Sequence, residues 1–453
     1  MTHTQTFIGA TGRYISNRRV QNSYFEQRKI RFFTPDGRRD PRTNKEIVTK
    51  LGSITGIQER RYFRSNISTS NAGFFATQDA RRSSGYNPKK TDVFIFAHNF
   101  GDNGDFDCVP SHAARIKNIL GIENPDIVAC DFAIGGIHWK QDLDRLKDYL
   151  GVGPNDLVVE TNGYDLTGIS EKAQSAFSVL DMDKENLHRV IVIHNLYEEF
   201  CLASKVKARW GITSPDVLAF DVLFGCPGWL HGASLAELFI SSGKAKRVMV
   251  IGAEALSRVS DPHDPDSQIY SDGAGATEFF GRVIAVPAKI DGKIFLFASV
   301  GAGMGANAMI YSKRYGMLGY MARSDTTPKH LNLLWMGKSY NPDLDGMFLK
   351  MSGRSVFGYA KGYVPELVKR LMDSLGIHIS QITRIFLHQA NETLDETMTD
   401  GVFELFYGRK DLSTKPPTAK YTIPKGLVPM TIKIYANNSV ATLCILLAEY
   451  GLN

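Results

Sequence analysis

The chain has 453 residues, 43% of them hydrophobic, which is ordinary for a soluble globular protein and enough to bury a large core. Its formal net charge of +6 is too weak to indicate nucleic-acid binding, but it is compatible with an acidic protein partner. The five cysteines form no CxxC pair, and their odd number argues against a disulfide framework. We find neither a signal peptide nor a membrane-spanning run, so we expect a cytoplasmic protein.

The first part of the chain predicts alternating strands and helices. Strands are expected over 6–14 and 92–98, and helices over 45–51 and 71–84. The segment 18–45 is rich in Arg and Lys. A solvated surface is the plainer interpretation, and a docking face for an acidic carrier protein is the alternative.

The chain then repeats a strand–helix–strand pattern. Residues 112–136 and 202–226 align without a gap, and nine of the 25 positions are identical. The strand before each copy also recurs, as DVFIFAHN before the first and RVIVIHN before the second. The pattern is typical of a parallel sheet, and two copies are too few for a solenoid. Because Gly136 takes the place of Cys226, the first copy lacks the thiol.

Cys226 lies where a predicted strand turns into a predicted helix, within DVLAFDVLFGCPGWLHGASLAELFISSG at 216–243. Pro227 suits the first helical position. A thiol at a helix N-terminus faces the positive end of the helix dipole, so we expect a lowered pKa and a nucleophilic thiolate. The plainer interpretation is a small buried side chain, which is the commoner role of a free cysteine.

Further strands are expected over 247–254 and 293–300, with a tight turn at Gly273 and Gly275 between them. The second strand leads into G-x-G-x-x-A, which starts at Gly301. A strand, this motif and a following helix would match a dinucleotide-binding fingerprint. The segment lacks the strand ending in an acidic residue that the fingerprint needs about 20 residues later, so we regard this as the weaker alternative.

Two polar residues follow later strands in the same way as Cys226. A helix over 359–375 precedes a strand over 384–388 that ends at His388, and a strand over 431–436 ends at Asn437. Sites in open α/β sheets gather at the carboxyl ends of strands. A thiol, an imidazole and an amide together supply what acyl transfer through a thioester requires.

At these residues the chain resembles the ketoacyl-acyl-carrier-protein synthase III family, whose members have the thiolase fold. The resemblance is carried by TGIQERRYF near residue 60, AFDVLFGCPGW, VIGAEALSR, YSDGAGAT, FLHQANE and YANNSVAT. It covers most of the chain in patches, and the order of the cysteine, HQAN and N-x-S motifs is specific. A Bacteroidetes-type subgroup that includes ketosynthases of dialkylresorcinol biosynthesis is the closer likeness.

The resemblance implies a decarboxylative condensation. Cys226 would take an acyl group from a thioester, and His388 and Asn437 would hydrogen-bond the carbonyl of a malonyl thioester while CO2 leaves. The backbone N–H groups of Cys226 and Gly303 would form the oxyanion hole. This chemistry needs no metal or redox cofactor, so none is expected. The acidic loop at 101–107 could suggest calcium, but it lacks the glutamate of a calcium loop.

Three features depart from the family pattern. The stretch of about 101–194 is an additional unit before the cysteine. The glycine-rich signature at 296–311 comes before HQAN, where the family has it after. Lys50 and Ile54 replace the Trp and Arg of members that use coenzyme A, and Pro265 replaces a further Arg, which favours acyl carrier protein over coenzyme A as the donor.

We therefore predict an α/β protein with the five-layered thiolase-like fold and an extra strand–helix–strand unit in its first half. Residues 1–285 would form the half with the nucleophile and 286–453 the half with His388 and Asn437. The resemblance also implies a homodimer. Alternative functions are a non-catalytic scaffold, suggested by the displaced glycine turn, and an acyltransferase that forms esters or amides through the same acyl-enzyme.

Overall fold

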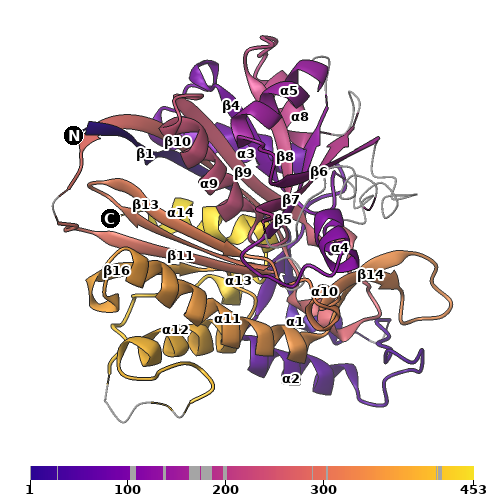
Figure 1. Ribbon diagram of the computed structural model, residues 1–453. Helices are drawn as coiled ribbons and strands as arrows, with labels where there is room; N and C mark the ends of the chain where they lie inside the picture. Colours follow the sequence, from indigo (N-terminus) through magenta and orange to yellow (C-terminus); the bar gives the residue numbers. More distant parts are fainter. Residues whose placement is uncertain are drawn as a thin grey trace.

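The structure of the protein is a computed structural model (Figure 1). It describes residues 2–27, 29–102, 109–135, 139–162, 174, 186–196, 201–287, 289–301, 305–414, 416 and 421–452.

The larger sheet contains the strand that leads to Cys226. Within the described residues it has eight strands, in the order β1-β10-β9-β4-β8-β5-β7-β6. Strands β9, β4 and β8 are parallel, β10 is antiparallel to both its neighbours, and β5 runs antiparallel to β8. The bounds are β1 Thr2–Tyr14, β10 Asp272–Ala285, β9 Arg247–Ala255, β4 Val93–Ala97, β8 Leu218–Leu223, β5 Val128–Ile134, β7 Arg189–Asn195 and β6 Asp156–Asn162.

The smaller sheet has the order β13-β12-β11-β16 in the described part of the chain, and β16 leads to His388. Its strands are β13 Gly316–Arg323, β12 Gly305–Ser312, β11 Ile294–Gly301 and β16 Ile382–Leu387. Two short antiparallel pairs lie outside these sheets: β2 Arg19–Gln21 with β3 Glu59–Arg61, and β14 Leu334–Lys338 with β15 Met347–Met351.

Helices and sheets alternate in five layers (Figure 1). Helices α3 and α8 cover the outer face of the larger sheet. Helix α11 covers the outer face of the smaller sheet with α12 packed against it, and α9 and α14 lie between the sheets. The α-helices are α1 Asn22–Phe25, α2 Asn44–Thr55, α3 Thr69–Ser84, α4 His112–Ile119, α5 Trp139–Leu150, α8 Leu202–Arg209, α9 Gly228–Ser241, α10 Pro328–Leu331, α11 Gly353–Ser374, α12 Glu392–Phe406, α13 Ile432–Tyr435 and α14 Thr442–Tyr450. Short 3-10 turns span Pro88–Lys90, Leu256–Arg258, Pro265–Ile269, Ile379–Gln381 and Ser439–Ala441.

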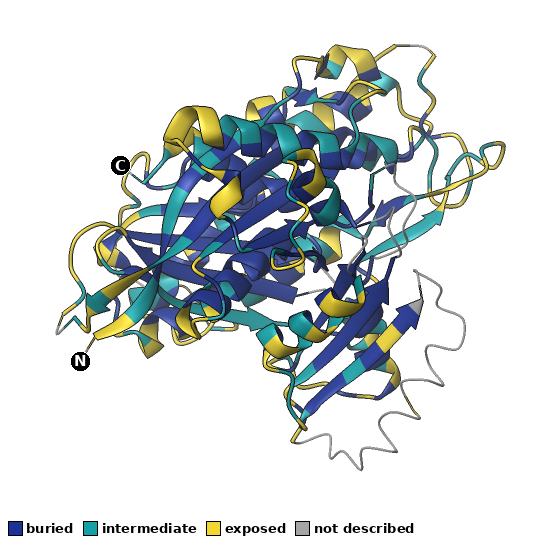
Figure 2. Cartoon of the chain, turned by 90° about the horizontal axis from the view of Figure 1, so that it is seen from above, coloured by how far each residue is buried: buried dark blue, intermediate teal, exposed yellow. Residues whose placement is uncertain are grey.

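The core between the sheets is aromatic. Trp229 of α9 is fully buried, and its ring lies 6.3 Å from Phe279 of β10 and 6.4 Å from Phe297 of β11. Figure 2 shows that the strands of both sheets are mostly buried and that exposed residues lie on outer helices and loops. The burial of these apolar side chains is the main stabilising contribution to the fold. None of the helices described is both long and apolar enough to span a bilayer.

The two sheets share one pattern of strand directions but start at different points of the chain. In the larger sheet β1-β10-β9-β4 runs antiparallel, antiparallel, parallel, and β13-β12-β11-β16 does the same in the smaller sheet. Along the sequence, the edge strand β1 is the first strand of the larger sheet, and the antiparallel pair β9-β10 is the last. In the smaller sheet the equivalent β11-β12 hairpin comes first, so the second half is a circular permutation of the first.

The repeat predicted at 112–136 and 202–226 forms α4-β5 and α8-β8, but the two copies exchange strands. Strand β4 precedes the first copy and pairs with β8 of the second, whereas β7 precedes the second copy and pairs with β5 of the first. The additional unit therefore extends the edge of the larger sheet with β5, β7 and β6.

Most predicted elements are present, and three details were wrong. Gly273 and Gly275 lie inside strand β10 and form no turn. Gly275 is required by packing, because a Cβ there would lie 2.5 Å from Cys444 Sγ of α14. The segment 431–436 forms the short helix α13 in place of a strand. The motif at Gly301 is followed by strand β12, which contradicts the dinucleotide fingerprint because that motif requires a helix.

Candidate active site

Cys226 lies at the turn between β8 and α9, as predicted. Strand β8 is buried along its whole length, and Gly225 takes a left-handed conformation (φ 65°) that lets the chain turn sharply. Pro227 directly precedes α9, and the His231 N–H donates to the Pro227 carbonyl at 2.9 Å. The thiol therefore lies at the N-terminal end of a buried helix.

His388 follows β16, and its neighbours in the HQAN motif fix its position. The His388 N–H donates to the Ala298 carbonyl of β11 at 2.9 Å. The Gln389 side chain donates to the Pro429 carbonyl and accepts from the Thr431 N–H. Asn391 caps α12 by accepting from the Leu394 N–H at 2.7 Å. The motif thus joins one site residue to two structural residues.

Asn437 is held in a strained segment. Ala436 (φ 51°, ψ −157°) and Ser439 (φ 51°) both have positive φ although neither is glycine, and such strain gathers at functional sites. The Asn437 carbonyl accepts from the Ser271 N–H at 2.9 Å, and its Oδ1 accepts from the Ser439 N–H at 2.8 Å. With Oδ1 occupied, the amide Nδ2 is the group that can donate to a ligand.

Cys226, His388 and Asn437 line one pocket, although they come from three distant segments of the chain. Its empty volume, including the part open to solvent, is about 620 Å³. The remaining lining is mainly apolar, with Val300, Leu256 and Leu349 among its members. The pocket therefore suits an acyl chain with a thioester at its polar end.

Sequence analysis missed a line of polar contacts that leads away from the thiol. Ser439 Oγ donates to Cys226 Sγ at 3.4 Å, and Asn99 Nδ2 lies 3.4 Å from Ser439 Oγ and donates to Glu254 Oε2 at 2.8 Å. The sequence contained a signal for these three residues. Asn99 follows a predicted strand, and Glu254 and Ser439 lie in the VIGAE and NNS motifs.

The predicted lowering of the thiol pKa was wrong. Burial raises the pKa of Cys226 to about 11, and the hydrogen bond from Ser439 opposes this rise only in part. Burial likewise raises the pKa of Glu254 to about 7 and lowers the pKa of His388 to about 4. At neutral pH the site therefore holds mainly a thiol and a neutral imidazole.

The strand that leads into the displaced glycine-rich segment ends beside the nucleophile. A Cβ at Gly301 would lie 3.2 Å from the Cys226 backbone nitrogen and 2.8 Å from Pro227 Cδ, so β11 ends directly against the turn that carries the thiol. Gly303 lies outside the described residues, as does most of the acidic loop at 101–107. In the part of the chain that the structure describes, the group that could hold a metal ion lies elsewhere, at His112, Asp131 and His194.

A second pocket adjoins the first, because Met351 lines both. Lys50, Ile54 and Pro265, the positions that depart from the coenzyme A pattern, all line this second pocket. Arg42 lines it too and pairs with Asp40 at 2.6 Å, and Asp264 and Asp266 are also part of the lining, so this pocket carries charges of both signs.

Residues 220–279 match the family model described as 3-Oxoacyl-[acyl-carrier-protein (ACP)] synthase III. This stretch contains the Cys226 turn, α9 and β9. A β-ketoacyl-[acyl-carrier-protein] synthase III from Prochlorococcus marinus is 27% identical over 280 residues, which covers 61% of this chain and 70% of the relative. Over these stretches the chain is similar to the 3-oxoacyl-[acyl-carrier-protein] synthase III family. A second synthase III, from Rhizobium johnstonii, is 30% identical over 231 residues, covering 51% of this chain and 58% of the relative.

A solved structure of a synthase III from Aquifex aeolicus has the same fold. It superposes with a TM-score of 0.54 at 18% sequence identity, covering 98% of this chain and 90% of that chain. The predicted thiolase-like fold of the synthase III family is therefore confirmed.

Proposed function

We propose that the protein catalyses a decarboxylative Claisen condensation of an acyl thioester with a malonyl thioester. The observation that supports the proposal most strongly is the convergence of Cys226, His388 and Asn437 on one apolar pocket. The sulfur, the imidazole and the amide are the groups that acyl transfer and enolate stabilisation require.

In the first step Cys226 attacks the acyl thioester. A new thioester forms on Sγ, the carrier thiolate departs, and the proton of the Cys226 thiol passes to the departing carrier sulfur. Because burial holds the pKa of Cys226 at about 11, the charge of the attacking sulfur must be stabilised as it develops. Ser439 donates to this sulfur and supplies part of that stabilisation.

In the second step His388 and Asn437 donate hydrogen bonds to the thioester carbonyl of the malonyl group. The bond to the carboxylate breaks, CO2 leaves, and the electron pair forms an enolate held by these two donors. A neutral imidazole is the required form, and burial keeps His388 neutral by lowering its pKa to about 4. The enolate carbon attacks the acyl carbonyl, Cys226 leaves as a thiolate and takes up a proton, and a 3-ketoacyl thioester is released.

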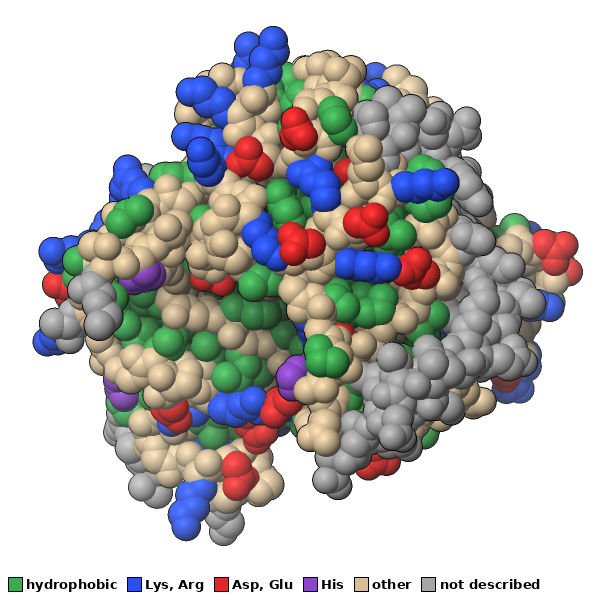
Figure 3. Space-filling view, turned by 45° about the horizontal axis from the view of Figure 1, so that its top comes forward, with side chains coloured by type: hydrophobic (Ala, Val, Ile, Leu, Met, Phe, Trp, Pro, Cys, Tyr) green, Lys and Arg blue, Asp and Glu red, His purple; other side chains and the backbone are tan. Residues whose placement is uncertain are grey.

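The donor in this proposal is an acyl carrier protein. The basic residues of the segment 18–45 are exposed where described, and Arg42 and Lys50 line the pocket beside the active site. Basic side chains around an entrance attract an acidic carrier. On the face shown in Figure 3, basic and acidic side chains are interspersed around apolar ones. A homodimer is part of the same proposal.

The proximity of Gly301 to the Cys226 nitrogen weakens the scaffold alternative, which rested on the displaced glycine turn. It supports a role for this segment in the oxyanion hole, with Gly303 as the proposed second donor.

The test is a reaction with acyl carrier thioester and malonyl carrier thioester labelled at the carboxyl carbon. We expect a 3-ketoacyl product and labelled CO2, with His388→Ala and Asn437→Ala still acylated but about 100-fold or more slower in CO2 release. Acylation without CO2 release would indicate an acyltransferase that forms esters or amides. A chain that neither becomes acylated nor releases CO2 would support the scaffold alternative.

A further inference from the structure

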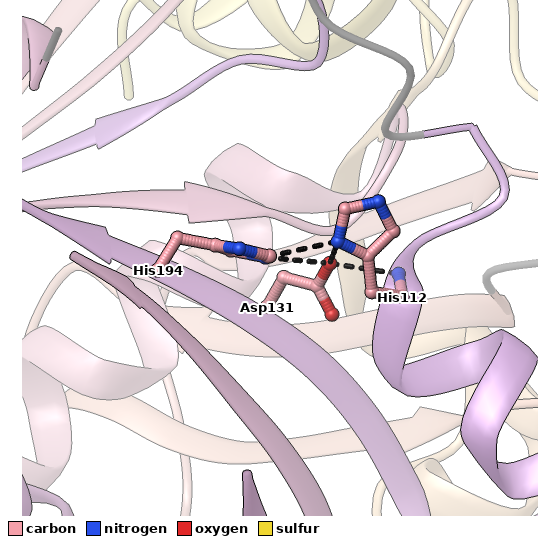
Figure 4. A group of neighbouring side chains, drawn as sticks. All are labelled: His112, Asp131 and His194. Atoms are coloured by element: carbon pink, nitrogen blue, oxygen red, sulfur yellow. Dashed lines mark hydrogen bonds and ion pairs between the residues drawn. The ribbon is translucent and has the colours of Figure 1, made fainter. Parts of the chain in front are cut away.

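The additional unit contains a buried cluster of metal-binding side chains. His112 at the start of α4, Asp131 in β5 and His194 in β7 point toward one another (Figure 4). The His112 Nδ1 and His194 Nε2 atoms lie 3.2 Å apart, and Asp131 Oδ2 lies 3.7 Å from the first and 3.3 Å from the second. All three side chains are at most 1% exposed.

These spacings match one metal ion. Zn²⁺ is usually tetrahedral with bonds of about 2.0–2.2 Å to nitrogen and oxygen, so its ligand atoms lie about 3.3–3.5 Å apart. The observed separations of 3.2, 3.3 and 3.7 Å lie around this value. Two imidazoles and one carboxylate are a common ligand set for zinc, with water in the fourth position.

The other copy of the repeat serves as an internal reference. There Asp221 accepts from the Leu202 and Ala203 N–H groups, just as Asp131 accepts from those of His112 and Ala113. His98 Nε2 lies 3.2 Å from Asp221 Oδ2, which corresponds to His194 and Asp131. The histidine–carboxylate pair and its helix cap are thus common to both copies. The difference is the third residue, which is His112 in one copy and Leu202 in the other.

The outer partner of each histidine differs as well. His98 Nδ1 accepts from the Gly101 N–H, so its Nε2 must carry the proton and cannot bind a metal. His194 Nδ1 lies 2.8 Å from the Thr161 hydroxyl, whose oxygen can accept a hydrogen bond from Nδ1–H, and this tautomer leaves the Nε2 lone pair for a metal.

We propose that His112, Asp131 and His194 bind one zinc-type divalent ion that fastens the N-terminus of α4 to β5 and β7. The ion would join elements of the additional unit, and this role is independent of the condensation chemistry. It replaces the expectation from sequence that the chain holds no metal.

The test uses the full chain after removal of metals with a chelator. Titration with Co²⁺ should give one bound ion per chain with the intense visible absorption of tetrahedral cobalt, and Zn²⁺ should displace it and raise the melting temperature. His112→Leu copies the residue of the other repeat and should weaken Co²⁺ binding at least about 100-fold, because loss of even an outer partner of a ligand can cost that much affinity. His3→Leu, which removes an exposed histidine, should bind like the wild type.

Co²⁺ binding of unchanged affinity in a folded His112→Leu protein would overturn the proposal and place the ion elsewhere, for example at Cys226. Circular dichroism establishes that the variant is folded. If the variant does not fold, the wild-type spectrum decides, because the absence of tetrahedral cobalt absorption would overturn the proposal. A hydrogen bond between the two imidazoles would then account for their contact.

Discussion

Ser439 connects the sulfur of Cys226 to a buried acid. Its hydroxyl donates to the thiol, and Asn99 lies between this hydroxyl and the carboxylate of Glu254. Because burial raises the pKa of the thiol to about 11, only a small fraction of Cys226 is ionised at neutral pH. Hydrogen bonds that stabilise the thiolate therefore have a direct effect on the rate of acylation.

Replacing Ser439 by Ala should slow acylation of Cys226 about tenfold, because one hydrogen bond to a charged group contributes about 1.5 kcal/mol. The measurement is the rate of alkylation of Cys226 by iodoacetamide as a function of pH. In the wild type the rate should rise continuously through pH 10, since the pKa is about 11, and Ser439→Ala should need a higher pH still. Ser53→Ala, an exposed hydroxyl, is the control. A wild-type plateau near neutral pH would contradict the raised pKa.

Gly301 tests whether the displaced turn takes part in the reaction. In Gly301→Ala the new Cβ would press on Pro227 Cδ at 2.8 Å and approach the Cys226 nitrogen, so the turn that carries the thiol must shift. A misplacement of this kind lowers kcat about 100-fold. Gly358→Ala in α11 has open space and should leave kcat unchanged. Equal activity of both variants would show that the close approach has no catalytic effect.

At the level of elements, the strands and helices with a clear hydrophobic period were predictable, and those set by distant contacts were not. TIKIYA at 431–436 has the composition of a strand, but it forms a helical turn, and the Lys433 carbonyl accepts from the Gln58 N–H far away in the sequence. From sequence alone the glycines of β10 are typical of a turn. Their actual role is to make room for α14, which packs closely on them and is far away in the sequence. The pKa of the Cys226 thiol is raised by burial under segments that are far apart in the sequence, so the residues next to Cys226 did not predict it.

Gly275→Ala should destabilise the packing of α14 on β10. The added methyl group would meet the Cys444 backbone at 2.9 Å as well as its sulfur, and overpacking of this kind reduces the free energy of unfolding by about 3 kcal/mol. Urea unfolding followed by tryptophan fluorescence measures the change. Gly153→Ala, with open space around it, should unfold like the wild type. An unchanged midpoint for Gly275→Ala would mean that the helix can move away freely.

At the scale of the whole molecule, the circular permutation of the second half joins positions that lie close together in space. The Tyr450 and Gly451 carbonyls accept from Arg384 of β16, which pairs with Phe295 at the start of β11. The end of α14 is therefore close to the start of the β11-β12 hairpin. The end of β10 is likewise close to the start of β13. Gln5 of β1 donates to the Met317 carbonyl of β13 and pairs with Arg282 of β10.

A reordered chain should therefore fold and remain active. In it, residues 289–314 follow residue 452 through a short Gly-Ser linker, and residue 286 is joined to residue 315 by another. This order places the glycine turn after HQAN, as in the family pattern. We expect a far-UV circular dichroism spectrum like that of the wild type and acylation within about tenfold of its rate, since loop closure of this length changes stability little. An unfolded or inert product would contradict the permutation account.

The division of the chain at residue 285 stays a prediction, although the strands of the two sheets lie on either side of it. The subgroup within the family and the dimer also stay predictions. The repeat was visible in the sequence, but its exchange of strands was not, because the alignment of 112–136 with 202–226 does not say which strand pairs with which.

The most direct test of the central claim is the intact mass of the protein after incubation with an acyl carrier thioester. A covalent intermediate on Cys226 predicts a mass increase of one acyl group, located on the peptide that contains Cys226, absent in Cys226→Ala and discharged when a malonyl carrier thioester is added. An unmodified chain, or an adduct that persists in Cys226→Ala, would contradict it.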